Sequence, residues 1–214
     1  MKNLIIFSSG TSEGGGSGLE NLVNKTREGI LSANIVAVVS NHENGGVRQK
    51  ANKLNIPFIY FPKPWDAEKY QEIVMDNKTD FVALSGWLKL VKGLDPRKTF
   101  NIHPGPLPAF GGAGMYGHHV HEAVMEAFKR GEVTHSAATM HFVTDEYDRG
   151  PIFFQKFVKI EEDDTVETLA KRVNETEHKY QPIITNMVVN SEISWDGKNP
   201  SSLTYPADYK IEQY

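Results

Sequence analysis

The first hundred residues alternate short apolar runs with amphipathic segments, and this alternation restricts the folds open to the chain. The apolar runs are continuous, which is typical of strands buried on both faces. Continuous strands separated by helices predict one doubly wound, mostly parallel sheet with helices on both faces, an α/β fold. The predicted strands are Leu4–Ser8, Ile35–Ser40, Phe58–Phe61, Phe81–Leu84 and Phe100–His103, and the predicted helices are Leu19–Leu31, Val47–Leu54 and Ala67–Asn77.

The second half of the chain has a different pattern. Residues 104–117 are rich in Gly and Pro, which indicates a loop over a site. A helix is predicted at His118–Arg130, followed by strands at Ala137–Val143 and Ile152–Ile160.

A further helix is expected to begin at Thr165. Asp164 is a suitable N-cap for it, with Glu167 at the capping-box position. Pro182 should kink or restart this helix, because proline has no backbone N–H to donate.

Length and composition favour a single domain with small-molecule ligands. The 214 residues are enough for one core, and a net charge of −4 gives no basic field for nucleic acid. The absence of Cys excludes disulfides, Cys-ligated zinc and a Cys nucleophile. The apolar run near the N-terminus is too short for a signal peptide, so a cytoplasmic location is expected.

Three polar side chains suggest acyl-transfer chemistry. Asn101 and His103 end a predicted strand, and Asp148 lies in a later turn. An amide can stabilise an oxyanion, an imidazole can move protons, and a carboxylate can orient the imidazole. Each residue alone is a weak signal, because a single His in a turn is usually structural.

The loop Ser9–Gly18 follows the first predicted strand and is rich in glycine. Such a loop can bring backbone N–H groups and a helix N-terminus close to a phosphate, although it contains no P-loop lysine. In a doubly wound sheet, ligands bind beyond the carboxyl ends of the strands. This rule places Ser9–Gly18, Ser85–Leu90 and Asn101–Pro104 on one rim.

The remaining histidines and Trp87 favour structural interpretations. His118, His119 and His121 begin a helix without a clear metal-binding spacing or carboxylate partner, so no metal site is predicted. His141 is either a packed strand residue or a support for the site. Trp87 is expected to pack rather than to stack on a ligand.

The motifs NIHPGPLP, HFVTDEYDRGPI and RVNETEHKYQP follow one another along the chain, with SGWLKLV upstream, and the resemblance that they carry extends over almost the full length. In this order they resemble the folate-dependent phosphoribosylglycinamide formyltransferase family of purine synthesis. The resemblance implies a Rossmann-like formyltransferase fold. It divides the single domain 1–214 into a phosphate-binding half (1–100), a catalytic and folate-binding half (101–189) and a C-terminal surface segment (190–214).

The resemblance also implies roles for individual residues. Asn101, His103 and Asp148 match the catalytic trio of the family, and Leu107-Pro108 matches a Leu-Pro bond that is cis. Asn174 and Glu177 match helix positions that face the ribonucleotide, and Gly16, Ser17 and Gly18 match the phosphate loop. The residues that match the folate site are Leu88, Lys89, Leu90, Val143, Thr144, Asp145 and Glu146.

The chain departs from the family pattern in three places. The phosphate loop, SGTSEGGGSGLEN, is longer than usual, with Gly18 at the position usually held by Asn. Lys89 replaces the more common Arg. The stretch FGGAGMYG after the PLP turn is also longer than usual.

The implied function is transfer of a formyl group from 10-formyltetrahydrofolate to the amine of glycinamide ribonucleotide, without a metal. Asn101 and protonated His103 would stabilise the oxyanion, and Asp148 would orient His103 and help to relay the amine proton. Small molecules are the expected partners, with neither nucleic acid nor membrane, and both a monomer and an oligomer are compatible with the sequence.

Four alternatives can be set against this function, and the sequence favours the methionyl-tRNA enzyme least. A formyltransferase for a nucleotide-linked amino sugar would carry the same trio. A formyltetrahydrofolate hydrolase normally has an extra N-terminal domain, whereas the first strand here starts at Leu4. A methionyl-tRNA formyltransferase would need a further C-terminal domain and a basic face. A nucleotide-binding module without enzymatic activity would leave the catalytic trio apart.

Overall fold

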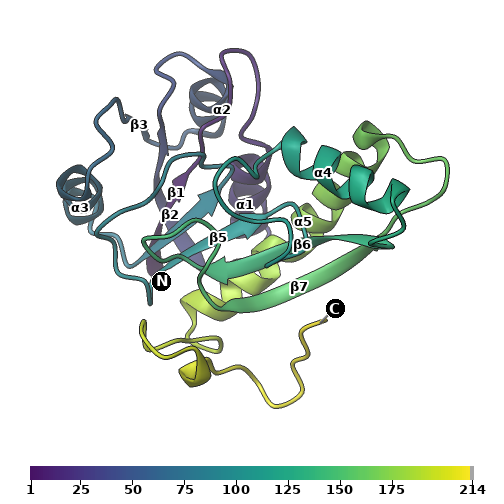
Figure 1. Ribbon diagram of the computed structural model, residues 1–214. Coiled ribbons are helices and arrows are strands. Elements are labelled where there is room, and N and C mark those ends of the chain that lie inside the picture. The colour runs from purple at the N-terminus through teal and green to yellow at the C-terminus, as the bar shows by residue number, and fades with distance from the viewer. Residues whose placement is uncertain (213–214) are drawn as a thin grey trace.

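The computed structural model describes residues 1–212, which are built around one seven-stranded sheet (Figure 1). The strand order is β3-β2-β1-β4-β5-β6-β7. Strands β1 to β5 pair in parallel, and β6 and β7 are antiparallel to their neighbours. The predicted doubly wound, mostly parallel sheet is therefore confirmed. The strands are β1 (Lys2–Phe7), β2 (Ala33–Ser40), β3 (Phe58–Tyr60), β4 (Phe81–Ser85), β5 (Thr99–His103), β6 (His135–Phe142) and β7 (Ile152–Lys159).

The predicted helices are present, with ends that differ by a few residues from the expected ones. This difference is normal, because the ends of a periodic pattern are its least defined part. The helices are α1 (Ser17–Arg27), α2 (Gly46–Leu54), α3 (Ala67–Asp76), α4 (His118–Lys129), α5 (Val166–Val189) and the 3₁₀ turn Pro200–Ser202.

Strand β1 shows how the two faces of the sheet are covered. Leu4 and Ile6 pack in a cluster with residues of α1, α2 and α5. Ile5 and Phe7 pack in the opposite cluster, which includes Tyr70 of α3. Successive strand residues point to opposite faces, so a continuous apolar run requires helices on both sides. This arrangement leaves the carboxyl ends of the strands as the place where loops can gather.

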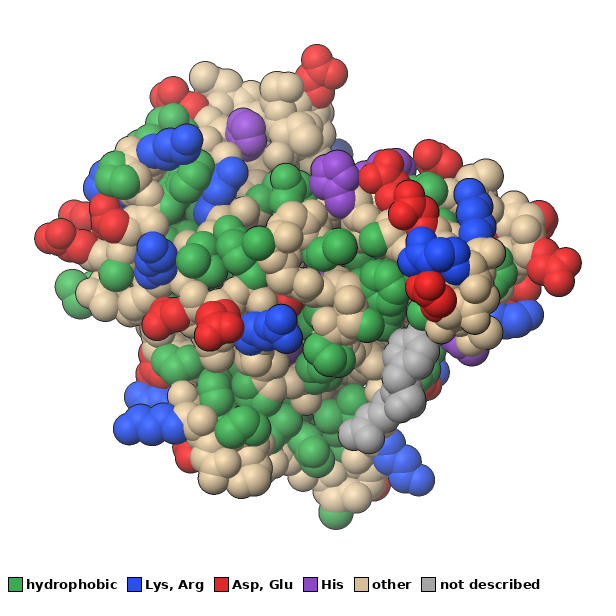
Figure 2. Space-filling model, in the orientation of Figure 1, with side chains coloured by type: hydrophobic (Ala, Val, Ile, Leu, Met, Phe, Trp, Pro, Cys, Tyr) green, Lys and Arg blue, Asp and Glu red, His purple; other side chains and the backbone are tan. Residues whose placement is uncertain are grey.

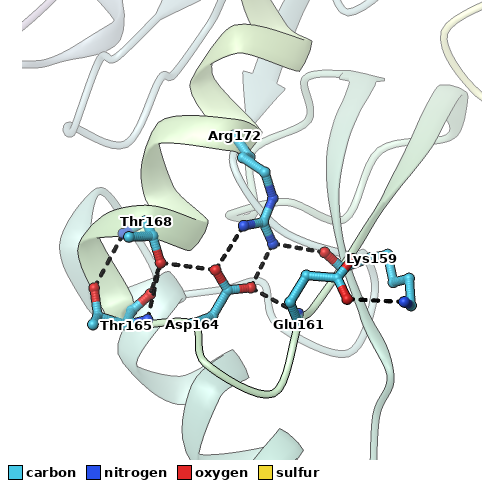
Figure 3. Close-up of polar contacts among 6 residues, drawn as sticks. All are labelled: Lys159, Glu161, Asp164, Thr165, Thr168 and Arg172. Carbon is cyan, nitrogen blue, oxygen red and sulfur yellow. Dashed lines mark hydrogen bonds and ion pairs between the residues drawn. The ribbon is translucent and has the colours of Figure 1, made fainter.

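The start of α5 is fixed by a polar network, and here one prediction was wrong (Figure 3). The N-cap is Thr165, which forms a capping box with Thr168. The carboxylate of Asp164 instead accepts hydrogen bonds from Thr168, from the Glu161 backbone N–H and from Arg172. Thr168 can replace an acidic residue in the box because its hydroxyl reaches back to the Thr165 N–H, so Glu167 is not the capping-box partner.

The restart predicted at Pro182 does not occur, because α5 runs without interruption from Val166 to Val189. Pro182 is buried within the helix. The apolar face of α5 packs on the sheet on both sides of the proline, and tertiary packing of this kind commonly overrides a local preference.

The segment after α5 returns along the edge strand β7. The Tyr209 hydroxyl donates to the Phe153 carbonyl at 2.8 Å, and the Glu212 carboxylate accepts from the Phe157 N–H at 2.7 Å. Positive and negative side chains are interspersed on the face drawn in Figure 2. None of the helices in residues 1–212 combines the length and apolar character that a membrane crossing requires.

Candidate active site

A cavity of about 570 Å³ lies at the carboxyl ends of β1, β4 and β5. Its walls come from the loop after β1, the segment after β4, the end of β5, the loop before α4 and one face of α5. The three segments predicted to share one rim all contribute residues. The cavity contains the predicted residues Gly16, Ser17, Gly18, Leu88, Asn101, His103, Asp148, Asn174 and Glu177.

Asn101 and His103 lie two residues apart on β5, so they share one face of the strand. Ile102 points the other way, into the core. Antiparallel pairing sets Asn101 opposite His141 of β6. The Asn101 amide nitrogen is 3.1 Å from His141 Nε2. The register of two strands therefore fixes the amide in place.

Asp148 reaches the same point from the turn between β6 and β7. Its Oδ2 is 3.8 Å from His103 Nδ1, and its Oδ1 is 3.3 Å from His141 Nε2. The Gly112 N–H donates to Oδ2 at 2.9 Å. Asp148 has a left-handed backbone, with φ of 54°. Asn101, His103 and Asp148 thus converge on one cavity.

His103 is almost completely buried, and its Nε2 lies 2.7 Å from the Phe110 carbonyl. A carbonyl only accepts, so Nε2 carries a proton. Burial lowers the pKa of His103, and the negative charge of Asp148 opposes this effect only in part. Burial thus disfavours the charged form of the ring, and Asp148 favours it, so the protonated His103 that the sequence suggested remains a prediction.

The carboxyl group of Asp148 remains ionised. Burial raises its pKa, but the hydrogen bond with His141, the charge of His103 and the Gly112 N–H together lower it below the usual value. The site therefore holds a carboxylate next to two imidazoles.

His141 belongs to this group, which supports the second of its two predicted interpretations. It is buried, and its Nδ1 lies 2.7 Å from the Phe142 carbonyl, so Nδ1 carries a proton. Its Nε2 faces both the Asn101 amide and the Asp148 carboxylate. A neutral His141 accepts from Asn101 there, and a protonated His141 donates to Asp148.

The glycine-rich loop forms the opposite end of the cavity. Gly16 is the N-cap of α1, with φ of 75° and no side-chain capping bond. A Cβ on Gly18 would lie 2.0 Å from the Ser85 hydroxyl oxygen. The first N–H groups of a helix have no partner within the helix, so those of α1 are available to a ligand on this wall.

Asn174 and Glu177 lie one turn apart on α5, and both line the cavity. The Asn174 amide donates to Glu177 Oε2 at 3.3 Å. Loss of hydration raises the pKa of Glu177 to about 7, although the Asn174 hydrogen bond acts in the opposite direction. At neutral pH this carboxyl group is divided between its neutral and charged forms.

The residues matched to the folate site lie in different parts of the structure and have different neighbours. Leu88 lines the cavity, and its N–H is held by the Ser9 hydroxyl at 3.0 Å. The Lys89 ammonium lies 4.6 Å from the centre of the Trp65 ring. The Leu90 carbonyl accepts from the Tyr70 hydroxyl at 3.2 Å.

The other folate-site residues lie in the turn after β6. Val143, Thr144 and Asp145 line a second cavity of about 180 Å³, together with Thr99 and Gly197. Glu146 is exposed, and its N–H lies 3.4 Å from the Thr144 hydroxyl. Their folate contacts remain predictions.

The cavity includes residues that the sequence analysis did not identify as site residues. Tyr116 and Tyr147 come from the longer loop and from the turn before Asp148, and His178 and Gln181 come from α5. The helical spacing from Asn174 to His178 and Gln181 could have indicated the α5 pair. Tyr147 is oriented by the Leu90 backbone, a long-range contact that leaves no local signal.

The histidines at the start of α4 correct one expectation. His118 and His119 do have a carboxylate partner, because Glu122 lies 3.5 Å from the first and 3.1 Å from the second. His121 is buried, and burial lowers its pKa to about 4. Within residues 1–212, no cluster of three His, Cys, Asp or Glu side chains has the geometry for a metal ion.

Other sequence predictions agree with the structure. Trp87 is buried in an aromatic cluster with Phe7, Phe61 and Tyr70. The Leu107-Pro108 bond is cis, as predicted, and Lys63-Pro64 is also cis.

Comparison with known proteins agrees with this geometry. The sequence model described as "Formyl transferase" matches residues 2–185. The chain belongs to the formyl transferase family. It is 37% identical over 205 residues to the chloroplastic phosphoribosylglycinamide formyltransferase of Arabidopsis thaliana, covering 91% of this chain and 68% of that protein.

Two further members of the formyl transferase family match most of the chain. The phosphoribosylglycinamide formyltransferase of Bacillus subtilis is 30% identical over 199 residues, covering 88% of this chain and 95% of that protein. The crystal structure of glycinamide ribonucleotide transformylase 1 from Symbiobacterium toebii has a TM-score of 0.79 at 26% identity, with 92% of each chain covered.

Proposed function

We propose that this protein transfers a formyl group from 10-formyltetrahydrofolate to the amine of glycinamide ribonucleotide. The observation that carries the proposal is the meeting of Asn101, His103 and Asp148 at one end of a cavity that has a glycine-rich helix start at its other end. The names of the relatives in Arabidopsis and Bacillus support the same reaction.

The reaction requires an oxyanion to be stabilised. The amine nitrogen attacks the formyl carbon, and the C–N bond forms while the carbonyl oxygen becomes negative. The Asn101 amide and an imidazole N–H of His103 are the donors that we assign to this oxygen. The Phe110 carbonyl holds the Nε2–H of His103 at 2.7 Å, so this role requires that N–H to exchange the carbonyl for the oxyanion.

Collapse of the intermediate breaks the bond between the formyl carbon and N10 of the folate. One proton must leave the amine, and one must reach N10. Asp148 is charged and lies beside His103, so it makes the imidazole more basic as positive charge develops. We assign to Asp148 the orientation of His103 and the relay of this proton, directly or through water.

The acceptor spans the cavity in this proposal. Its phosphate lies on the N–H groups of residues 14–19, within reach of Gly16, Ser17 and Gly18. Its ribose hydroxyls face Asn174 and Glu177, an amide and a carboxyl group already aligned on α5. Holding both substrates in one cavity lowers the entropic cost of the bimolecular step.

The proposal uses no metal ion, because the amide and the imidazole supply two donors. It places the reaction in the cytoplasm, with small molecules as ligands and without nucleic acid or membrane partners. The folate is expected to contact Leu88, Lys89 and Leu90 on one side and Val143, Thr144, Asp145 and Glu146 on the other.

A paired assay tests the acceptor. Purified protein is given 10-formyltetrahydrofolate with glycinamide ribonucleotide or with a nucleotide-linked amino sugar, and the formylated products are measured. We expect formylation of the ribonucleotide. Formylation of the amino sugar alone would contradict glycinamide ribonucleotide as the acceptor, but it would still support formyl transfer as the reaction.

A variant tests the ribose contact. Glu177→Ala should raise the KM for glycinamide ribonucleotide more than the KM for the folate, because the carboxyl group faces the ribose end of the cavity. Glu175→Ala is the control, since Glu175 is exposed on the same helix. Equal changes in both KM values would contradict the ribose assignment.

A further inference from the structure

A buried amide on α5 lines the cavity with one of its polar atoms unpaired. Gln181 is only 2% exposed, yet it contributes to the cavity wall. Its Oε1 lies 3.5 Å from the hydroxyl of Ser85, which is also buried. Within residues 1–212, its Nε2 has no hydrogen-bond partner. An unpaired buried donor is costly, so this amide is suited to a ligand that supplies an acceptor oxygen.

A glycine on α1 makes room for these two polar groups. A Cβ on Gly18 would overlap the Ser85 hydroxyl and would lie 3.4 Å from Gln181 Oε1. No larger side chain fits there, so Ser85 and Gln181 fill the space beside the helix. The hydroxyl and the amide therefore form one closely packed corner of the cavity.

A proline fixes the position of Gln181 relative to α1. Pro182 lies inside α5 and has no N–H, so the carbonyl of His178, four residues earlier, receives no hydrogen bond from its own helix. The Asn21 amide of α1 donates to this carbonyl instead, at 2.8 Å. This contact ties α1 to the turn of α5 that carries Gln181, so the amide has a fixed place on the cavity wall.

The amide lies on the opposite side of the sheet from the catalytic pair. Along β4, Leu84 packs on the α3 side, and Ser85 points the other way, toward α1 and α5. On β5, Ile102 packs on the side of α1 and α5, so its neighbour Asn101 points to the α3 side. Gln181 is therefore placed to bind the acceptor and not to act on the formyl group.

The proposed acceptor has an oxygen at the matching place. Its ribose hydroxyls are assigned to Asn174 and Glu177, and its phosphate to the N–H groups of α1. Gln181 lies one turn beyond Glu177 on the same face of α5, next to Gly18. In a ribose 5-phosphate, the ring oxygen lies across the ring from the hydroxyls and beside the carbon that bears the phosphate arm. The amide is therefore located where this ring oxygen is expected.

We propose that Gln181 is a specificity-determining residue that donates a hydrogen bond from Nε2 to the ring oxygen of the acceptor's ribose. Ser85 orients the amide by donating to its Oε1. The contact selects a sugar ring over a carbocycle of the same shape. This inference rests on the proposed function, since it names a residue that recognises one atom of the proposed acceptor.

Two acceptors that differ in one ring atom test the contact. Kinetics are measured with glycinamide ribonucleotide and with its carbocyclic analogue, in which a methylene group replaces the ring oxygen. The wild type should have a KM about fivefold higher for the analogue, because one neutral hydrogen bond is lost. Gln181→Met should raise the KM for the ribonucleotide about fivefold without raising that for the analogue. An equal change for both acceptors, or for neither, would overturn the proposal.

Ser85→Ala tests the orientation of the amide with little risk to folding, because it only shortens a side chain. It should raise the KM for the ribonucleotide about twofold and leave that for the analogue unchanged. Gln49→Met is the matched control, since Gln49 is exposed on α2. Its KM values should equal those of the wild type. A rise as large as that in Gln181→Met would show that the change of side chain matters and its position does not.

Calorimetry with ribose 5-phosphate tests the contact without turnover. Ribose 5-phosphate should bind the wild type about fivefold more tightly than Gln181→Met, whereas its carbocyclic analogue should bind both proteins equally. Equal affinities of the two proteins for ribose 5-phosphate would reject the inference, even if glycinamide ribonucleotide is formylated. If binding depends on Gln181 but glycinamide ribonucleotide is not formylated, the proposed function fails and the contact with the ring oxygen stands.

Discussion

The two ends of the cavity are built from different parts of the chain. At one end, strand register aligns side chains of β5 and β6, and Asp148 meets them from the turn after β6, with contacts of 3.1 to 3.8 Å. At the other end, an exposed glycine-rich loop offers backbone N–H groups. A shift in strand register would separate the first set of groups. The loop end tolerates a longer loop, because every residue except proline can supply a backbone N–H.

The largest effect should come from the side-chain end. Asp148→Asn should lower kcat about 100-fold or more, because it removes the charge that makes His103 more basic. Asn tolerates the left-handed backbone at this position, so the fold should persist. Turnover is measured by formyl transfer, and folding by thermal melting.

Asp76→Asn is the control for this variant, since Asp76 is exposed at the end of α3. It should behave like the wild type. If Asp148→Asn turned over at the wild-type rate, Asp148 would have no catalytic role. The contrast between a side-chain end and a backbone end of the cavity would then not hold for catalysis.

The loop end should be sensitive to added volume. Alanine normally favours a helix over glycine by about 1 kcal/mol, yet Gly18→Ala should destabilise the protein by about 1–3 kcal/mol, because its Cβ meets the Ser85 hydroxyl. Gly14→Ala should cost less, because its Cβ meets only the Thr11 hydroxyl at 3.5 Å. Denaturant unfolding of both variants measures the difference. Equal stabilities would show that the loop end is less tightly packed than we describe.

The KM for the acceptor should depend on pH through Glu177, which lines the α5 side of the cavity. Glu177 has a pKa raised to about 7, so it becomes charged between pH 6 and 8 and then accepts hydrogen bonds more strongly. The KM for the acceptor should fall about fivefold over this range. Glu177→Gln should remove the dependence, and persistence of the full dependence in that variant would assign it to another group.

The raised pKa of Glu177 also makes the free energy of unfolding depend on pH. A carboxyl group whose pKa is raised on folding favours the native state most at low pH. That contribution is lost as the pH rises from about 4.5 to about 7, and it stays lost above. Unfolding free energies of the wild type should therefore fall relative to Glu177→Gln across this window. A constant difference would contradict the raised pKa.

The smallest effect should come from a variant of the polar network at the start of α5. This helix also carries Asn174 and Glu177, which are proposed to face the acceptor. Arg172→Met removes the partner of Asp164 and should lower the free energy of unfolding by about 1 kcal/mol. It should leave kcat unchanged. The pKa of Asp164 is held below its usual range mainly by Arg172, so this stabilisation is present above about pH 4 and is lost in acid. If Arg172→Met lowers the free energy of unfolding by the same amount in acid, the ion pair with Asp164 is not the source of the stabilisation.

The sequence predicted most of the fold, because the apolar runs and the helical spacing are local signals. Strands β1 and β4 follow directly from continuous apolar residues. One error occurred at the start of α5, where Thr165 and not Asp164 is the N-cap, and of the two outcomes expected at Pro182 the restart does not occur.

The site was only partly predictable. Motifs identified Asn101, His103 and Asp148 one by one, but the contact between His141 and Asp148 depends on the turn after β6. The lowered pKa of His103 depends on its burial, and the proximity of Lys50 to Gly16 depends on how the longer loop rests on α2. These features arise only when distant segments meet.

The buried Trp87 gives this protein an internal optical reporter. Trp87 is one of the residues that line the cavity, and its Nε1 donates to the Tyr70 hydroxyl, whose pKa burial raises. Indole emission depends on the polarity and hydration of its surroundings. A ligand that displaces water from the Leu88 wall should therefore change the emission of Trp87, so occupancy can be followed in unmodified protein and in real time.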